Sequence, residues 1–217
     1  MTTKTRHVFA SIKGEKREIN KDNLLLIEEP DYNVFAVFDG VSSAIGGGEA
    51  SKNAADFIKA NHKKYLGNEI KLKQLMYDTN SHLLKTGTKE PFTTFCLVYQ
   101  NKTNSSFTYS WLGDSRLYII SNQFMEQITL DDNYSENVLT KYLGDPQLHI
   151  SDFRQEEKLK NNLHLLLCTD GFSRVLEKDK LAFFEVFQKK SLKTISEKIN
   201  SLIKGKNIDD STFIFVK

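Results

Sequence analysis

Short apolar runs and amphipathic segments follow one another along the chain in an irregular order. The apolar runs have strand length and are rich in β-branched and aromatic residues, which predicts strands. They span residues 8–10, 24–27, 34–38, 93–99, 107–112, 117–121, 163–168 and 212–216. Other segments repeat apolar residues at every third or fourth position, as amphipathic helices do. They span residues 50–65, 72–83 and 192–203, and a shorter helix is predicted over residues 178–188.

The order of these elements indicates the fold class. The first two predicted helices are adjacent in the chain, and so are most of the predicted strands between residues 93 and 129. Runs of strands joined by hairpins, with helices apart from them, are typical of an α+β fold with antiparallel sheets. Each helix has a single apolar stripe and is therefore expected to cover one side of a sheet.

A single domain is predicted over residues 1–217, because no repeat, low-complexity tract or Pro/Gly-rich linker divides the chain. With 39% hydrophobic and 27% charged residues, the chain can form a large core. No run approaches the roughly 18 apolar residues of a membrane span, and residues 1–7 lack the apolar stretch of a signal peptide. A cytoplasmic monomer without a membrane partner is therefore expected. A net charge of +2 is too small to predict a nucleic-acid partner.

Both cysteines of the chain, Cys96 and Cys168, lie in predicted strands. Their position in apolar strands predicts that both thiols are buried. In the reducing cytosol expected for this chain, they are predicted to be free. A disulfide between the two is the alternative.

Acidic residues at the ends of apolar strands give the strongest chemical signal. Asp39 and Asp170 follow two of the apolar runs, and Asp209 precedes the last one. A carboxylate at the mouth of a buried strand is costly to desolvate unless it is paired. Carboxylates in this setting with no evident basic partner predict a site for hard divalent cations with oxygen ligands.

The same positions also have a simpler interpretation, because Asp-Gly is a common hairpin turn. The segments after Asp39-Gly40 and Asp170-Gly171 lead into predicted helices rather than paired strands, which favours a site. Gly113-Asp114 lies between two predicted strands, and there both interpretations stay open.

Short segments distributed along the chain together form a recognisable set. They are Arg17–Asp22, Val37–Gly40, Leu112–Arg116, Asn137–Thr140, Cys168–Gly171 and Asp209–Thr212. In this order they resemble the motifs of the metal-dependent (PPM, type 2C) serine/threonine protein phosphatases, over nearly the whole chain. The resemblance implies a four-layer αββα sandwich, in which two antiparallel sheets lie face to face with helices outside. This agrees with the α+β prediction.

The resemblance implies roles for the matching residues at a centre of two Mn²⁺ or Mg²⁺ ions. Asp39 would bridge the two ions, and the carbonyl of Gly40 would reach one of them directly or through water. Asp170 and Asp209 would complete the shell of the other ion. Asp22 would support the site through water.

Arg17 and Asp114 receive further roles from the same resemblance. Arg17 would hold the substrate phosphate with its planar fork of donors. Asp114 resembles the ligand of a third, weaker metal ion in bacterial members. Water activated by the two metal ions would then hydrolyse phosphoserine or phosphothreonine in a protein that a serine/threonine kinase has phosphorylated.

Several residues depart from the family pattern. Lys21 stands where many members have an acidic residue or glutamine, and its ammonium could either weaken the second metal or extend into solvent. Val41 replaces a histidine that is a candidate general acid in eukaryotic members. Ser42-Ser43 replace a glycine pair, Phe92 replaces a glycine, and Asp210 replaces an asparagine.

The largest departure is a deletion. Family members commonly carry a mobile flap before the motif that begins here at Asn137. Only residues 132–136 separate that motif from the preceding strand-like region. A barer substrate surface is therefore expected, as in a minimal bacterial-like member that lacks the flap.

Other functions stay open beside the phosphatase. Lys21 and the missing flap favour a catalytically weak or inactive phosphatase-like module with a binding or regulatory role. The strand-end aspartates together with Arg17 favour an enzyme. A metal-dependent hydrolase of small phosphoesters is a third interpretation.

Overall fold

The computed structural model describes residues 6–67, 69–104, 106–135, 138–160 and 162–217 of the chain. The strands in these ranges are β1 (His7–Ile12), β2 (Asn23–Glu28), β3 (Tyr32–Phe38), β4 (Phe95–Asn101), β5 (Ser106–Leu112), β6 (Arg116–Ile120), β7 (Met125–Gln127), β8 (Asn133–Ser135), β9 (Val138–Leu139), β10 (Glu156–Leu159), β11 (His164–Cys168) and β12 (Ser211–Val216). The helices are α1 (Gly47–Tyr65), α2 (Leu72–Lys85), α3 (Asp170–Lys178), α4 (Lys180–Phe187) and α5 (Leu192–Ile203), with a short 3-10 turn η1 (Ile150–Asp152).

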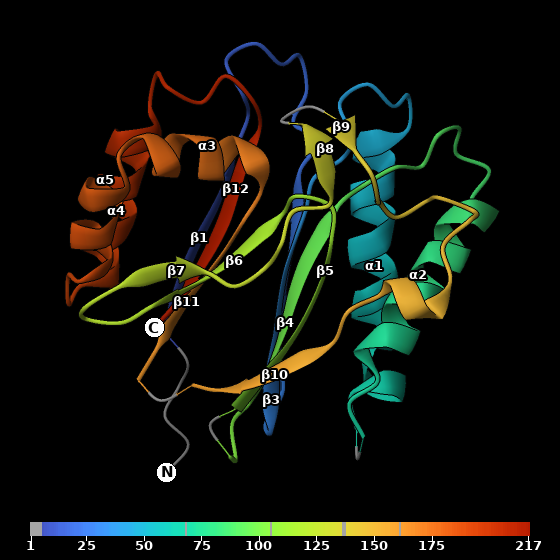
Figure 1. Ribbon diagram of the computed structural model, residues 1–217, viewed down its shortest axis with the longest axis horizontal. Helices are drawn as coiled ribbons and strands as arrows, with labels where there is room; N and C mark the ends of the chain where they lie inside the picture. The colour runs from blue at the N-terminus through green and yellow to red at the C-terminus, as the bar shows by residue number, and fades with distance from the viewer. Residues whose placement is uncertain (1–5, 68, 105, 136–137, 161) are drawn as a thin grey trace.

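Antiparallel sheets lie face to face at the centre of the fold. In the described ranges, one five-stranded sheet has the order β1-β12-β11-β6-β7 and the other has the order β10-β5-β4-β3-β2. Helices α3, α4 and α5 cover the outer face of the first sheet, and α1 and α2 cover that of the second (Figure 1). The predicted four-layer αββα sandwich is confirmed.

Alternating side chains of the central strands divide the interior into layers. In β3, Val34, Ala36 and Phe38 lie in the core under α1 and α2. Phe35 and Val37 lie in the core between the two sheets. A strand buried on both faces has a continuous apolar run in its sequence, which is why β3 could be predicted so clearly.

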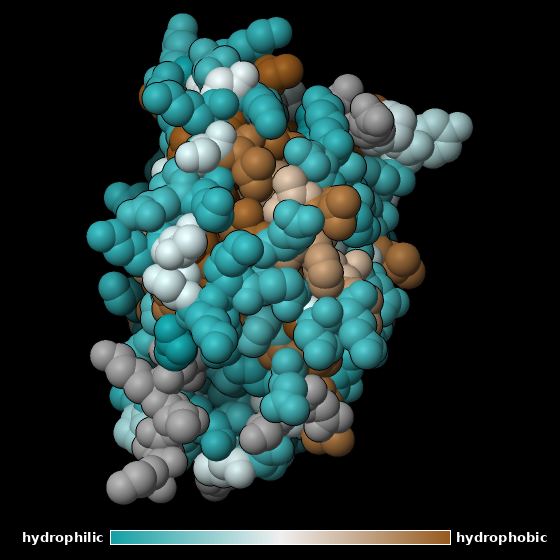
Figure 2. Space-filling view, turned by 90° about the vertical axis from the view of Figure 1, so that its left-hand side faces the viewer, coloured by the Kyte–Doolittle hydropathy of each residue, from teal (hydrophilic) through white to brown (hydrophobic). Residues whose placement is uncertain are grey.

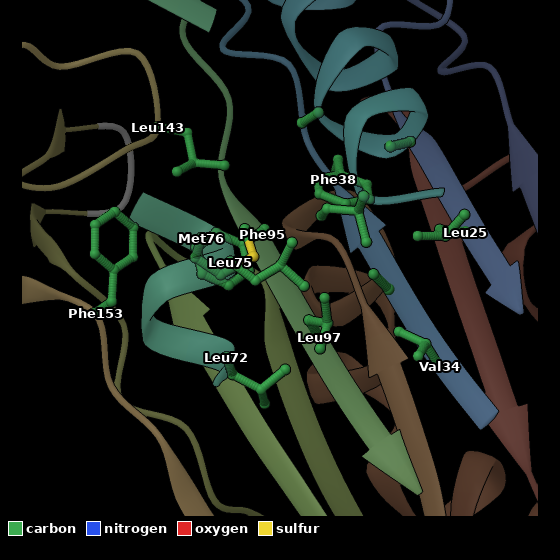
Figure 3. Close-up of a cluster of buried hydrophobic side chains, with 14 of the residues drawn as sticks. Leu25, Val34, Phe38, Leu72, Leu75, Met76, Phe95, Leu97, Leu143 and Phe153 are labelled. Carbon is green, nitrogen blue, oxygen red and sulfur yellow. The ribbon is translucent and has the colours of Figure 1, made fainter. Parts of the chain in front are cut away.

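The helices α1 and α2 pack on the second sheet through a cluster of buried apolar side chains (Figure 3). Leu72, Leu75 and Met76 of α2 belong to this cluster, together with Phe95 and Leu97 of β4, and all of them are fully buried. Burial of each such side chain contributes roughly 1.5–3 kcal/mol. This layer therefore fixes the helix pair on the sheet.

The outer surface over the first sheet is mostly hydrophilic when seen from the side of α3, α4 and α5, with apolar side chains between the polar ones (Figure 2). In α5, Ile195, Ile199 and Ile203 are buried and follow one another at intervals of four, as the predicted apolar stripe requires. None of the described helices is long and apolar enough to span a membrane.

Cys96 and Cys168 are both buried free thiols, as predicted. Cys96 lies in the core between the sheets, whereas Cys168 faces the helices that cover the first sheet. The alternative of a disulfide between them is wrong.

The short elements differ from the sequence expectation. The helix expected over residues 178–188 is divided, because α3 ends at Lys178 and α4 begins at Lys180. Strands β7, β8, β9 and β10 have no counterpart among the predicted strands. Every residue of β10 is exposed, so its sequence shows no apolar alternation. Asn137, the first residue of one family motif, lies outside the described residues.

The segment in which a flap was expected to be missing is short. It contains β8, which pairs with β9 of the following motif in a small antiparallel ribbon. This ribbon lies at the end of the sandwich where α1 and α3 begin (Figure 1).

At this end the chain also passes from one sheet to the other. Residues 13–22 lead from β1 of the first sheet to β2 of the second, and residues 113–115 lead from β5 of the second sheet to β6 of the first. The loop after β3 lies at the same end, because it leads into α1. Residues that are distant in the sequence are thereby brought close together.

Candidate active site

The ends of several strands place predicted site residues around one cleft. Asp39 follows β3, Asp170 begins α3, Asp114 lies in the turn between β5 and β6, and Asp209 precedes β12. Together with Arg17 from the β1–β2 crossover, they line a cleft of about 200 Å³. The other lining residues are Val41, Ser42, Ser43, Thr94, Leu139 and Arg174.

Asp22 and Gly40 lie beside this cleft and are not among its lining residues. The hydroxyl of Thr169 donates a hydrogen bond of 2.8 Å to the Asp22 carboxylate, which places Asp22 next to the start of α3. The amide of Gly40 donates to the carbonyl of Lys21 at 3.3 Å. This bond between Gly40 and Lys21 holds the segment after Asp39 beside the segment that carries Asp22.

The main chain of Asp39 is held by the neighbouring segment before β4. Its carbonyl accepts hydrogen bonds from the Thr94 amide and the Thr93 hydroxyl, both at 2.8 Å. Burial raises the pKa of the Asp39 carboxyl well above its ordinary range, and the charges of Asp22 and Asp170 raise it further. A site that disfavours the bare carboxylate in this way favours a cation beside it.

Asp22 has the same electrostatic character. It is buried, and burial raises its pKa to about 8 despite the hydrogen bond from Thr169. Its second carboxylate oxygen, Oδ1, is buried and has no hydrogen-bond partner among the described residues. A buried oxygen without a partner is costly unless water or a cation satisfies it.

Asp114 lies in a turn that depends on the preceding glycine. Gly113 has a φ of +90°, a conformation that favours glycine. Burial raises the pKa of Asp114 to about 7, and the charges of Asp170 and Asp131 add to the shift. Gly113-Asp114 forms the turn between β5 and β6, and Asp114 also lines the cleft. A role of Asp114 as a metal ligand stays a prediction.

Arg17 forms a two-pronged contact with Asp209 across the cleft. Its Nε donates to Oδ1 at 2.6 Å and its Nη2 donates to Oδ2 at 2.5 Å. Burial pushes the pKa of Asp209 up, but the bonds from Arg17 and from the Asp210 amide bring it below its ordinary value. The expected phosphate-binding residue is therefore paired directly with an expected metal ligand.

Arg174 makes a second contact of this kind. It lies one turn after Asp170 on α3, and its Nη2 is 2.6 Å from Oδ2 of Asp170. The positive charge of Arg174 also lowers the pKa of Asp114, although burial outweighs it. Asp209 and Asp170, two expected ligands of the metal site, thus each have a guanidinium partner.

The side chain of Lys21 is bonded to main-chain carbonyls rather than extended freely into solvent, and its effect on a metal ion stays a prediction. Its ammonium donates to the main-chain carbonyls of Ser42 and Ala44, at 2.9 and 3.0 Å. Its amide donates to Asp210 Oδ2 at 2.8 Å, and the Gly14 amide donates to Oδ1 of the same carboxylate at 2.9 Å. Lys21 and Asp210 therefore join the crossover from β1 to the loops around the cleft.

The glycines of the two Asp-Gly pairs are required by close backbone contact. A Cβ on Gly40 would lie 2.4 Å from the carbonyl oxygen of Gly47, and a Cβ on Gly171 would lie 2.1 Å from that of Asp210. Neither glycine has a positive φ. The hairpin-turn interpretation is wrong for both, because Asp39-Gly40 leads into α1 and Asp170-Gly171 begins α3. The glycines instead allow the loops around the cleft to approach each other.

The donor set of the cleft fits a hard divalent cation. Its carboxylates and the nearby Gly40 carbonyl are the oxygen ligands that Mg²⁺ and Mn²⁺ prefer, and the unpartnered Asp22 Oδ1 lies beside them. Within the described ranges, no three His, Cys, Asp or Glu side chains come close enough to hold a metal ion. Asp209 and Asp170 are each paired with an arginine, Arg17 and Arg174.

Neither Arg174 nor Thr169 was predicted from the sequence as a site residue. Arg174 could have been found, since it follows Asp170 by four residues and this spacing places both side chains on one face of a helix. Thr169 could not, because its partner Asp22 is 147 residues away in the chain.

A sandwich of this architecture with a carboxylate-lined cleft at one end of its sheets is the fold of the metal-dependent protein phosphatases. The family model described as Protein phosphatase 2C matches residues 14–204, and the chain belongs to this family. The resemblance inferred from the sequence motifs is thereby confirmed. Comparison with curated protein sequences gives no match.

Solved structures with the same fold come from several phosphatases. Stp1, a serine/threonine phosphatase from Staphylococcus aureus, has a TM-score of 0.83 at 20% identity, covering 100% of this chain and 96% of that one. PppA, described as a key regulatory component of T6SS in Pseudomonas aeruginosa, has a TM-score of 0.81 at 20% identity, with 100% and 98% covered. RsbX in complex with magnesium has a TM-score of 0.72 at 18% identity, with 98% and 94% covered.

Proposed function

We propose that this protein is a metal-dependent phosphatase that removes phosphate from serine or threonine side chains of a phosphorylated protein. The observation that carries the proposal is the meeting of Arg17 with the carboxylates of Asp39, Asp114, Asp170 and Asp209 in one cleft. Family membership supports the same reaction class. The kinase that phosphorylates the substrate is proposed as a functional partner.

Asp39, Asp170 and Asp209 are the proposed ligands of two Mn²⁺ or Mg²⁺ ions, together with the Gly40 carbonyl. When bound, such ions lower the pKa of water and draw charge from phosphate oxygens. Asp22 lies behind these ligands, and its unpartnered oxygen would orient a water toward them.

Arg17 would exchange its carboxylate partner for the substrate phosphate. Its two donors already lie in the parallel arrangement that a pair of phosphate oxygens accepts. In this role Arg17 orients the phosphate and balances its charge on the equatorial oxygens.

Protonation of the leaving serine or threonine oxygen is assigned to water. Val41 lines the cleft at the position where, from the motif resemblance, eukaryotic members carry a histidine as candidate general acid, and the side chain of valine has no proton to donate. The exposed hydroxyls of Ser42 and Ser43 lie at the same wall, where they can donate to substrate oxygens.

A regulatory binding module is the second candidate, and the arginine contacts favour it. With Arg17 on Asp209 and Arg174 on Asp170, two carboxylates of the cleft are neutralised without a metal ion. Such a module would bind phosphoprotein but turn it over slowly or not at all.

Hydrolysis of a phosphothreonine peptide with Mn²⁺, beside the Asp39→Asn variant, separates these functions. A phosphatase releases phosphate only when Mn²⁺ is present, and Asp39→Asn abolishes the release. Peptide binding without phosphate release would favour the module. Hydrolysis of p-nitrophenyl phosphate alone would indicate an enzyme for small phosphoesters.

A further inference from the structure

A second cleft adjoins the proposed active site on the side of α3. It has a volume of about 400 Å³ and shares Asp114, Asp170 and Arg174 with the first cleft. From there it extends along α3 as far as Lys178. A chain segment attached to a residue in the first cleft can therefore continue into the second.

The β8–β9 ribbon lies between the two clefts. Asn133 of β8 is the register partner of Leu139 of β9. Asn133 lines the second cleft, whereas Leu139 lines the first. The two clefts thus flank one short ribbon.

Several charged side chains in the second cleft already have protein partners. Arg116 donates to both carboxylate oxygens of Asp131, with the closest contact at 2.6 Å. Glu177 accepts a hydrogen bond of 2.7 Å from the Tyr118 hydroxyl. These contacts stabilise the walls and leave those groups little capacity to bind a ligand.

Two hydrogen-bond donors of this cleft have no partner among the described residues. The ammonium of Lys178 and the amide of Asn133 make no hydrogen bond or ion pair with any described residue. Lys178 is exposed at the end of α3. An ammonium and an amide can both donate hydrogen bonds, so the cleft fits a segment that offers a carboxylate and main-chain carbonyls.

We propose that the second cleft binds the peptide segment next to the phosphorylated residue, and that Lys178 selects an acidic side chain in that segment. This rests on the proposed phosphatase function and adds the substrate class. An acidic residue within a few positions of the phosphate would reach Lys178, while Asn133 would bind the main chain.

Phosphothreonine peptides of equal length, flanked on both sides either by Glu or by Gln, test the proposal. We expect a kcat/KM about 10-fold higher for the Glu peptide, through a lower KM. Lys178→Ala should reduce this ratio to about 2-fold or less, and Lys178→Glu should favour a peptide flanked by Lys. Because the two peptides are compared within one variant, a change in the overall rate of that variant cancels in the ratio of their kcat/KM values. Lys59→Ala, which changes an exposed lysine on α1, should keep the wild-type ratio.

Equal kcat/KM for the Glu and Gln peptides, or a preference that persists in Lys178→Glu, would overturn the proposal. Phosphonate versions of the peptides cannot be hydrolysed, so their binding, measured by fluorescence anisotropy, gives the same comparison without turnover. Absence of hydrolysis with all substrates would reject the phosphatase function. A binding preference for the Glu peptide that depends on Lys178 would still support the second cleft.

Discussion

The guanidinium of Arg17 donates two parallel hydrogen bonds to the carboxylate of Asp209, at 2.6 and 2.5 Å. A phosphate would bind Arg17 and a metal ion would bind Asp209, so each ligand would break this pair. Binding of either ligand should therefore release the partner that the second ligand needs. Linkage then requires that metal and phosphate strengthen each other's binding to the same extent.

Arg17→Ala should lower kcat/KM by about 100-fold, close to 2.7 kcal/mol of transition-state stabilisation. Its Mn²⁺ affinity should be equal to or tighter than that of the wild type, because Asp209 loses a competing partner. Steady-state kinetics and calorimetric Mn²⁺ titration check the two parts. Arg17→Lys is the control that keeps the charge but loses the paired donors. A collapse of Mn²⁺ affinity in Arg17→Ala would show that the residue is structural.

Metal should stabilise the fold, and more strongly at pH 8 than at pH 6. The pKa of Asp22 is raised to about 8 and that of Asp114 to about 7, from an ordinary 3.8. Between the ordinary pKa and the raised pKa of each group, the carboxyl is protonated in the folded chain and ionised in the unfolded chain. Without metal, the contribution of these two carboxyls to the free energy of unfolding therefore falls as the pH rises from about 4 to about 8. Metal binds the deprotonated carboxylates and offsets this loss.

Melting curves with Mn²⁺, and after addition of EDTA, measure this effect. At 100 times the dissociation constant the gain is about 2.7 kcal/mol, which corresponds to an increase of about 5–10 °C in Tm for a chain of this size. Asp39→Asn should show a much smaller shift. Identical curves with and without Mn²⁺ would exclude the metal centre.

Lys21→Met should destabilise the fold by about 1–2 kcal/mol, because the carbonyls of Ser42 and Ala44 lose a charged donor. The number of Mn²⁺ ions bound should be the same in the wild type, Lys21→Met and Lys21→Glu. Urea unfolding and calorimetric titration provide the measurements. Lys59→Met, at an exposed site, should change stability by no more than about 0.5 kcal/mol. An additional ion in Lys21→Glu would mean that the lysine acts on the metal site.

Arg174→Ala should tighten the weakest Mn²⁺ site by about 10-fold. In the wild type the guanidinium of Arg174 bonds Asp170 and lies near Asp114, so a third ion at these carboxylates would have to displace it. Electron paramagnetic resonance of free Mn²⁺ during titration measures this affinity. Arg174→Lys, which keeps a positive charge, should resemble the wild type. An equally weak site in Arg174→Ala would contradict the competition.

The sequence was informative where local pattern decides the structure. The run Val34–Phe38 is buried on both faces, so the strand and the position of Asp39 at its end could both be inferred. Asp170 could be placed for the same reason at the end of β11. These positions follow from strand burial and need no knowledge of distant contacts.

Other features depend on partners that are remote in the chain. The ammonium of Lys21 bonds main-chain carbonyls of a loop whose path depends on Gly40 and Gly47, and no side-chain pattern encodes those acceptors. Strand β10 exists because it pairs with β5, although all of its own side chains are exposed. Pairing through the main chain leaves no signature in its composition.

The cleft is built on places where the chain steps between the two sheets. Arg17 and Asp114 lie on such steps, whereas Asp39 belongs to the end of one sheet and Asp170 to the end of the other. A small shear of the sheets would therefore change the spacing of the carboxylates before it broke any strand pairing. Side chains in the layer between the sheets, such as the fully buried Phe35, oppose that shear. The apolar layer between the sheets thus sets the distances between the carboxylates of the cleft. A substitution that leaves a cavity in this layer would weaken metal binding while the chain still folds.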